Sequence, residues 1–147
     1  SRHLALFAFI LAAPLALLAG NPAPDAEANF EQRLRTANAA ESLDAYAALY
    51  DFTGTPVEMQ KELLAIWGKV HGLDIVSIEF TKLTNAQRSA FSQIITFQGK
   101  PYVVNLPPAR LVKTTYRLDA KSEPVVHSYA VGTKNGQFFC PGVKPKM

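Results

Sequence analysis

The spacing of apolar residues changes once along this chain, at Gly72, and the change determines the fold class that we expect. Before Gly72, apolar side chains recur every three or four residues, as in amphipathic helices. After it they alternate with polar side chains, for example at Val76, Ile78 and Phe80, as in half-buried antiparallel strands. We therefore expect an α+β protein whose helices come first and cover a sheet formed by the rest of the chain.

Three helices are predicted in the first part. Residues 30–39 form one, and Ser42 caps a second that runs to Tyr50. The third has the strongest start signal, because Thr55 to Glu58 combine a capping box with a proline at the first helical position. Its apolar face consists of Met59, Leu63, Ile66, Trp67 and Val70.

The second part predicts a curved antiparallel sheet of five or six strands, on which the three N-terminal helices pack. Asn135-Gly136 is the preferred pair for a type I′ turn and predicts the last hairpin. The predicted strands cover residues 76–80, 91–97, 102–106, 110–118, 125–133 and 137–140.

The N-terminus carries an uncharged apolar run, residues 4–19, that follows Arg2 and precedes small and polar residues. Because it contains Pro14 and is shorter than the roughly 20 residues of a membrane span, we expect a signal peptide and no stable membrane anchor. The predicted signal peptide covers residues 1–28, with a cleavage site at Ala26-Glu27-Ala28, and leaves a single domain of residues 29–147. Cleavage near Gly20 is the alternative. The protein is then exported, to a periplasm or to the medium.

The order of these elements resembles the nuclear transport factor 2-like superfamily. The resemblance covers residues 29–147 and rests on three helices followed by a long meander, which closes with Gly132, Gly136 and the aromatic Phe138. It implies a cone-shaped α+β fold with a pocket between the third helix and the concave face of the sheet. The superfamily includes isomerases, dehydratases, transport adaptors and immunity proteins, so the resemblance alone does not select a function.

Aromatic residues large enough to line such a pocket are spread over the whole chain. Most of them are expected in the core, but a buried tyrosine needs a hydrogen-bond partner and is useful beside a ligand. The residues predicted to bind a ligand are Tyr50, Trp67, Tyr116, His127 and Tyr129.

His127 is the residue from which catalysis would start, since it shares a strand face with Val125, Tyr129 and Val131. If the protein is an enzyme, His127 acts as a general base and Tyr116 or Tyr129 holds a substrate oxygen. The alternative is a structural histidine with a satisfied hydrogen bond. Asp51 is either an acidic partner for His127 or a solvated residue near a turn.

The sequence lacks the motifs of several common classes of enzyme and binding site. We find no nucleotide-binding glycine loop, no zinc-ligand spacing and no Gly-x-Ser-x-Gly, and therefore expect neither a cofactor nor a metal. Cys140 is the only cysteine, so an internal disulfide is excluded, and we expect Cys140 to be a buried apolar residue.

Charge divides the predicted domain into two halves. Residues 29–80 carry four basic and eight acidic side chains, whereas residues 81–147 carry ten basic and two acidic ones. Lys113 and Arg117 are predicted on one strand face and would form a basic stripe on the outer sheet surface. Export argues against a nucleic-acid partner for this charge.

Three functions remain open. The first is a non-enzymatic domain that binds a small, partly apolar ligand or a peptide in a cavity between helix and sheet. The second is a pocket enzyme that transfers a proton, as an isomerase or a dehydratase does. The third is an interaction module that docks an acidic partner, or forms a homodimer, through the sheet surface that carries Lys113 and Arg117.

Overall fold

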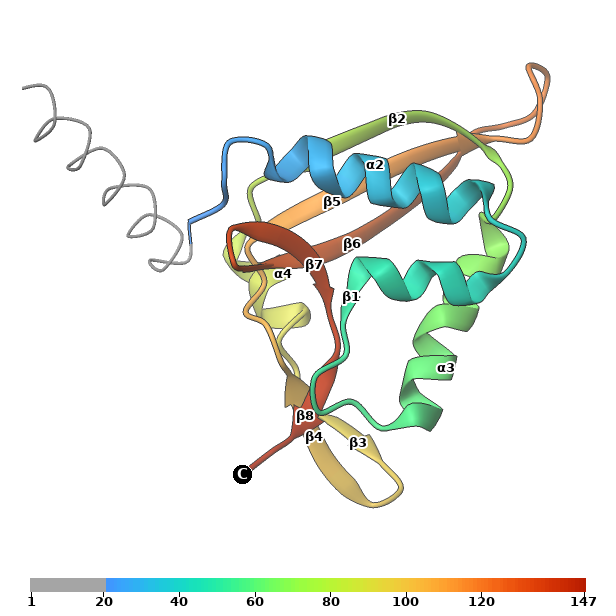
Figure 1. Ribbon diagram of the computed structural model, residues 1–147. Coiled ribbons are helices and arrows are strands. Elements are labelled where there is room, and N and C mark those ends of the chain that lie inside the picture. The colour runs from blue at the N-terminus through green and yellow to red at the C-terminus, as the bar shows by residue number, and fades with distance from the viewer. Residues whose placement is uncertain (1–20) are drawn as a thin grey trace, which may run out of the picture.

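The order of elements confirms the α+β class (Figure 1). The computed structural model describes residues 21–147, so the predicted signal peptide lies outside the described residues up to Gly20. The helices are α2 (Ala26–Ala39), the 3-10 helix η1 (Leu43–Leu49), α3 (Val57–Ala65), its 3-10 continuation η2 (Ile66–Lys69) and α4 (Asn85–Ala90). The strands are β1 (Tyr50–Asp51), β2 (Asp74–Thr81), β3 (Ile95–Phe97), β4 (Lys100–Val104), β5 (Arg110–Arg117), β6 (Val125–Lys134), β7 (Gln137–Pro141) and β8 (Val143–Pro145).

The strands differ from the predicted single antiparallel sheet in two ways. They form a five-stranded sheet in the order β1-β7-β6-β5-β2 and a separate three-stranded sheet in the order β3-β4-β8. The larger sheet is mixed, because β1 pairs in parallel with β7 and places Tyr50 opposite Cys140. The chain leaves the larger sheet at Gly142, whose N–H donates to the Asp51 carbonyl over 2.9 Å. A side chain at Gly142 would collide with Thr55 and with the Asp51 carbonyl, so this crossing requires glycine.

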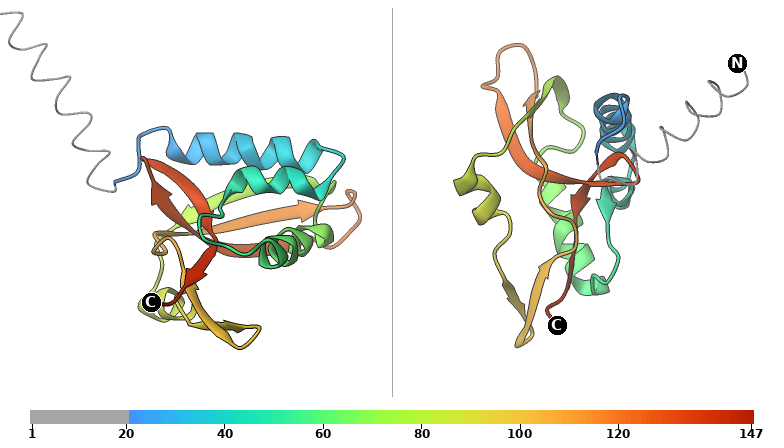
Figure 2. Two further views of the ribbon diagram at one scale, coloured as in Figure 1. Left: turned by 60° about the horizontal axis from the view of Figure 1, so that its bottom comes forward. Right: turned by 90° about the vertical axis from the view of Figure 1, so that its left-hand side faces the viewer.

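Helix α2 covers one face of the larger sheet, and α4 lies on the opposite side (Figure 2). The buried face of α2 comprises Ala26, Phe30, Leu34 and Ala37, which belong to the same apolar cluster as inward-facing residues of β5, β6 and β7. The helix begins at Ala26 rather than at the predicted residue 30. Since Ala26 is 1% exposed, residues before Asn29 contribute to the core.

Two capping interactions differ from the prediction. Thr55 does not cap α3, because its hydroxyl accepts from Val143 N and donates to Val143 O at 3.0 and 2.7 Å. A capping box occurs at Thr84 and Gln87 instead, where each side chain accepts from the other residue's N–H. It starts α4, so the expected strand over residues 91–97 shortens to β3.

Other local predictions are confirmed. The Ser42 hydroxyl accepts from Asp44 N over 3.1 Å and caps η1. Asn135 and Gly136 have φ angles of 52° and 77°, as a type I′ turn requires. Cys140 is free and buried.

The two neighbours of β6 pair with different parts of it, and this creates the opening in which the candidate site lies. Strand β5 pairs with β6 from Val125 to Val131, whereas β7 pairs with it only from Gly132 to Lys134. Beyond that point β7 turns away toward β1 and the smaller sheet, while β6 continues beside β5 (Figure 1). Within residues 21–147, no helix has both the length and the apolar character needed to cross a membrane.

Candidate functional site

A cleft of about 380 Å³ occupies the angle between β6 and β7. Helices α3 and η2 bound it on one side, and the segment from α4 to β3 bounds it on the other. Its volume lies in the range typical of small-molecule pockets. The lining residues are Tyr50, Leu63, Ile66, Trp67, Phe91, Ile95, Val104, His127, Ser128, Tyr129, Ala130, Cys140, Pro141 and Val143.

The inner wall is built around Trp67, which the helical spacing of α3 and η2 directs onto β6. Its ring meets the rings of His127 and Tyr129 edge-on, with centroids 4.8 and 5.2 Å apart. Its indole N–H donates to the Tyr50 hydroxyl over 3.0 Å. On the far side it stacks on Tyr46, which is fully buried. The aromatic wall is therefore held in place by contacts on every side.

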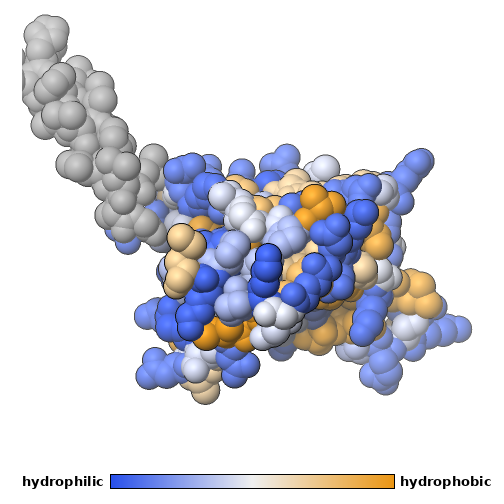
Figure 3. Space-filling view, turned by 90° about the horizontal axis from the view of Figure 1, so that it is seen from below, coloured by the Kyte–Doolittle hydropathy of each residue, from blue (hydrophilic) through white to orange (hydrophobic). Residues whose placement is uncertain are grey.

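The rim of the cleft exposes apolar side chains. Ile66 on η2 is 51% exposed, and Ile95 on β3, across the opening, is 42% exposed. Seen from below, apolar surface lies between hydrophilic residues on this side of the molecule (Figure 3). Exposed aliphatic residues on both sides of an apolar cavity are expected where an apolar occupant enters.

The lining contains no Asp, Glu, Lys or Arg side chain from the described part of the chain, and its titratable groups are neutral near pH 7. Burial lowers the pKa of His127 below its ordinary value of 6.5. Burial raises the pKa of Cys140 to about 12 and that of Tyr129 well above its ordinary value. Burial likewise raises the pKa of Tyr50, against the smaller effect of the Trp67 hydrogen bond. The cleft thus suits an uncharged occupant.

His127 contributes its imidazole ring to the lining of this cleft. Its Nδ1 is buried and has no hydrogen-bond partner among residues 21–147. The ring therefore presents a neutral aromatic surface to the cleft, while this nitrogen faces the protein interior. The hydroxyl of Tyr129, 3.3 Å from Thr114 Oγ1, already has a partner.

Of the five residues predicted to bind a ligand, the structure brings four together. Tyr50, Trp67, His127 and Tyr129 line the cleft. Tyr116 does not, because it faces the core beneath α2, is fully buried, and has a hydroxyl without a partner in the described chain. Burial raises its pKa, so this phenol stays neutral.

Sequence reasoning missed the outer half of the cleft. Phe91 and Ile95 were predicted in one strand over residues 91–97, so a position at the cleft was not expected for them. The capped helix α4 and the short strand β3 bring both residues to the rim. Ile66 was placed on the apolar face of the third helix, which was expected to be buried. The run of apolar residues at Ile94 and Ile95 was the signal available for this side.

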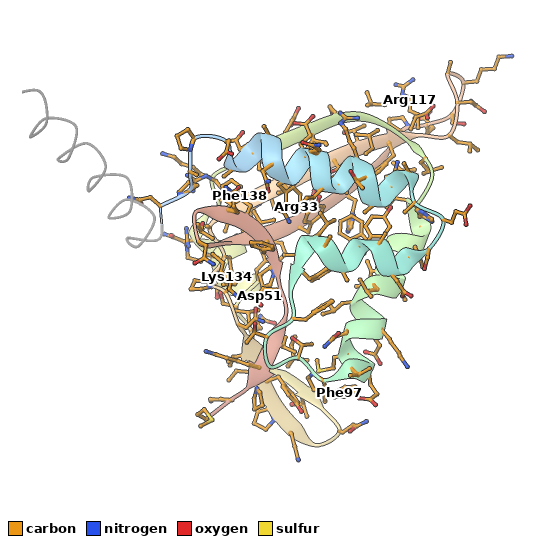
Figure 4. The ribbon with its side chains drawn as sticks, in the orientation of Figure 1. Arg33, Asp51, Phe97, Arg117, Lys134 and Phe138 are labelled. Atoms are coloured by element: carbon orange, nitrogen blue, oxygen red, sulfur yellow. The ribbon has the colours of Figure 1, made fainter. Side chains whose placement is uncertain are left out.

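Asp51 lies outside the cleft. It sits beside Lys134 (Figure 4), whose Nζ is 3.3 Å from Asp51 Oδ2, and it accepts hydrogen bonds from Thr53 N and Thr53 Oγ1. Burial alone raises the pKa of Asp51, but the hydrogen bonds from Thr53 and Lys134 outweigh it and lower the pKa. Asp51 is therefore a structural carboxylate that joins β1 to β6.

The predicted basic stripe faces acidic neighbours. In the pairing of β2 with β5, Lys113 lies opposite Glu79 and Arg117 lies opposite Asp74. Each of the two basic residues thus has an acidic residue on the neighbouring strand, although neither pair forms a salt bridge within residues 21–147. Among the residues that the structure describes, no group of three or more His, Cys, Asp or Glu side chains is arranged to hold a metal ion.

Another hollow, of about 340 Å³ between α2 and η1, is lined by alanines and polar side chains and contains no aromatic residue. The cleft between β6 and β7 is the stronger candidate because aromatic and apolar side chains converge there, together with the imidazole of His127. Comparisons with protein-family models, curated proteins and solved structures found no match to this chain. Function is therefore inferred from the geometry of the cleft.

Proposed function

We propose that this protein binds an uncharged, partly apolar ligand, a small molecule or a peptide, in the cleft between β6 and β7, without transforming it. One observation carries the proposal: an open cleft of about 380 Å³ is lined by apolar and aromatic side chains and by no charged one of the described chain. Such a lining with few polar groups is typical of binding sites for apolar ligands.

Trp67 provides the readout for a test, because it is the only tryptophan in the chain and lines the cleft. The neutral fluorophore N-phenyl-1-naphthylamine absorbs where tryptophan emits. We expect it to bind saturably and to quench Trp67 emission by energy transfer.

Two variants localise the binding. Ile66→Ser and Ile95→Ser remove half-exposed rim residues, so each should weaken fluorophore binding about threefold to tenfold at little cost in stability. Val57→Ser is the matched control, since Val57 lies on α3, is 58% exposed and does not line the cleft. No saturable quenching, or equal weakening by Val57→Ser, would contradict the proposal.

Proton transfer by His127 is a second candidate, favoured by the position of this neutral imidazole in the lining of the cleft. A general base in this position would act on a substrate held against Tyr129 or Tyr50. It would do so without a carboxylate to orient the imidazole, since the described lining contains none. Turnover of an added ketosteroid or hydroxyacyl probe that is abolished by His127→Gln would favour this candidate over simple binding.

Membership of the nuclear transport factor 2-like superfamily and export remain proposals. Helices covering one face of a curved sheet, with a cleft beside α3, support the first. The uncharged apolar run of residues 4–19 supports the second. Finding the protein in the culture medium or periplasm of its source cells, shortened at its N-terminus, would test export.

A further inference from the structure

The edge of β6 that faces the cleft has no strand beside it. Strand β5 occupies the other edge along Val125–Val131, and β7 covers the cleft edge only along Gly132–Lys134. In residues 21–147, no other strand pairs with β6. The peptide groups between Val126 and Ala130 that point into the cleft therefore lack the partners that a sheet normally supplies.

The hairpin geometry determines which peptide groups these are. Lys134 and Gln137 flank the two-residue turn, so they form a hydrogen-bonded pair, and hydrogen-bonding direction alternates along an antiparallel strand. The N–H and C=O groups of Ala130 and Ser128 then point to the β7 side, and those of Tyr129 point to β5. One observed hydrogen bond supports this alternation. The Val131 carbonyl points toward β5, because it accepts from the N–H of Ala109, which directly precedes β5, over 2.8 Å. No described side chain hydrogen-bonds to the main chain of Ser128 or Ala130.

Apolar walls stand on both sides of this edge. Trp67 and Leu63 come from α3 and η2, and Phe91 and Ile95 come from the other side. A strand placed along β6 would direct alternate side chains toward the two walls. A compact small molecule fills the cavity but does not offer backbone donors and acceptors at the spacing of a strand.

We propose that the occupant of the cleft is an extended peptide segment of a partner protein, which pairs with β6 at Ser128 and Ala130 and adds a strand to the sheet. The proposal rests on the proposed function, because it names the ligand class of the same cleft. About five residues fit along the open edge.

Charge specifies the partner further. The segment inside the cleft is uncharged and alternates apolar residues, because the described lining has no charged side chain. The smaller sheet borders the cleft through Ile95, Val104 and Val143, and carries Lys100 and Lys144 without any acidic residue. The segment is therefore flanked by acidic residues on that side.

The test begins with a phage-displayed library of random eight-residue peptides, selected for binders that N-phenyl-1-naphthylamine displaces. For the best synthetic peptide, amide hydrogen exchange of the full protein is measured by NMR. Strand addition predicts that the N–H groups of Ser128 and Ala130 become at least tenfold more protected, with a much smaller change at Tyr129, which is already paired to β5.

Matched variants separate main-chain from side-chain binding. Ser128→Pro removes the N–H that points into the cleft and leaves the pairing with β5 intact, so peptide affinity should fall about tenfold or more. Ser128→Ala keeps that N–H and should change peptide affinity less than threefold. Fluorophore titration of both variants, each compared with the original chain, separates loss of the N–H from a change in the shape of the cleft.

Two N-methylated versions of the peptide make the test independent of any variant. One is methylated at its odd residues and the other at its even residues. Strand addition predicts that only one of them loses binding, because only alternate N–H groups face β6.

The outcomes distinguish the two proposals. Equal effects of both methylated peptides, or binding without protection of Ser128 and Ala130, would overturn strand addition and leave the apolar cleft as a ligand site. If the fluorophore binds but no peptide is selected, strand addition is likewise overturned and the cleft remains a site for an apolar ligand. If neither fluorophore nor peptide binds, both proposals fail.

Discussion

The indole N–H of Trp67 donates to the hydroxyl of Tyr50 over 3.0 Å and thereby connects η2 to the edge strand β1 across the cleft. Tyr50 lies opposite Cys140 in the parallel pairing of β1 with β7. The bond therefore holds the helical wall at a fixed distance from the strand that turns away from β6. The width of the cleft depends on this contact.

Tyr50→Phe removes the acceptor for Trp67 and leaves a buried N–H without a partner. We expect the free energy of unfolding to fall by about 1–2 kcal/mol, and the Trp67 emission to change. Urea denaturation followed by Trp67 fluorescence measures both effects. Tyr102→Phe is the control, since Tyr102 is also largely buried but belongs to the separate Met59 cluster. Equal effects of the two substitutions would contradict a special role for the bond.

Stability should fall in acid because of His127. Burial lowers its pKa in the folded protein below the ordinary 6.5, so the unfolded chain binds this proton more tightly. The stability that neutral, buried His127 contributes is fully present above pH 6.5, and it is lost as the pH falls through the folded-state pKa of His127. The pKa values of Tyr129 and Cys140 are raised by burial, so these groups do not titrate in this range.

The His127→Leu variant should therefore lose less stability than the original chain between pH 7 and pH 5. Urea midpoints at half-unit steps of pH measure the difference. His71 is present in both proteins and cancels in the comparison. Parallel curves for the two proteins would show that His127 is not protonated on unfolding. Fluorophore binding should weaken over the same pH range, because an imidazolium charges an apolar wall.

Asp51→Asn should destabilise the fold by about 1–3 kcal/mol at pH 7, since it weakens the hydrogen bonds from Thr53 and the ion pair with Lys134. The folded-state pKa of Asp51 is lowered, so its contribution is present above the unfolded value of about 3.9 and disappears as the pH falls through the folded value. Stability measured from pH 7 to pH 2 should therefore converge for the two proteins in acid. Glu31→Gln, which breaks the exposed pair with Arg35, should cost at most about 0.5 kcal/mol.

A chain that starts at Asn29 should be less stable than one that starts at Asn21. It lacks the first turn of α2, the buried Ala26 and the hydrogen bond from Ala23 N to Gly136 O at 2.7 Å. We expect a loss of about 2 kcal/mol in the free energy of unfolding. Chemical denaturation of both chains measures it. Equal midpoints would show that cleavage at Ala28 is tolerated, whereas the expected loss favours cleavage near Gly20.

The first three helices were predictable from sequence because their signals are local, whereas α4 was missed. Apolar spacing and the Ser42 cap specify α2, η1 and α3 through neighbours a few residues apart. The Thr55 pattern failed as a cap because its hydroxyl has a better partner in Val143, 88 residues away. The parallel β1–β7 pairing and the second sheet were not predictable for the same reason, since both depend on long-range contacts of β7 and β8.

The inner half of the candidate site was predictable and the outer half was not. The periodicity of one helix and one strand was enough to predict that Trp67, His127 and Tyr129 point toward the same cavity. Tyr116 was predicted to bind a ligand but lies in the core with α2, because its place depends on which helix packs over that end of β5. The open edge of β6 depends on where β7 diverges, which no periodicity in the sequence encodes.

Strands β7 and β8 supply pairing partners to β1, β6 and β4, all of which precede them along the chain. A ribosome or a translocation channel delivers a chain from its N-terminus, so neither sheet is able to gain its closing strand until residues 137–145 have emerged. Until then, Tyr50 lacks its strand partner Cys140, and the Thr55 hydroxyl lacks its two hydrogen bonds to Val143. Both sheets therefore depend on the same C-terminal segment, and a change that displaces it should disturb the two together.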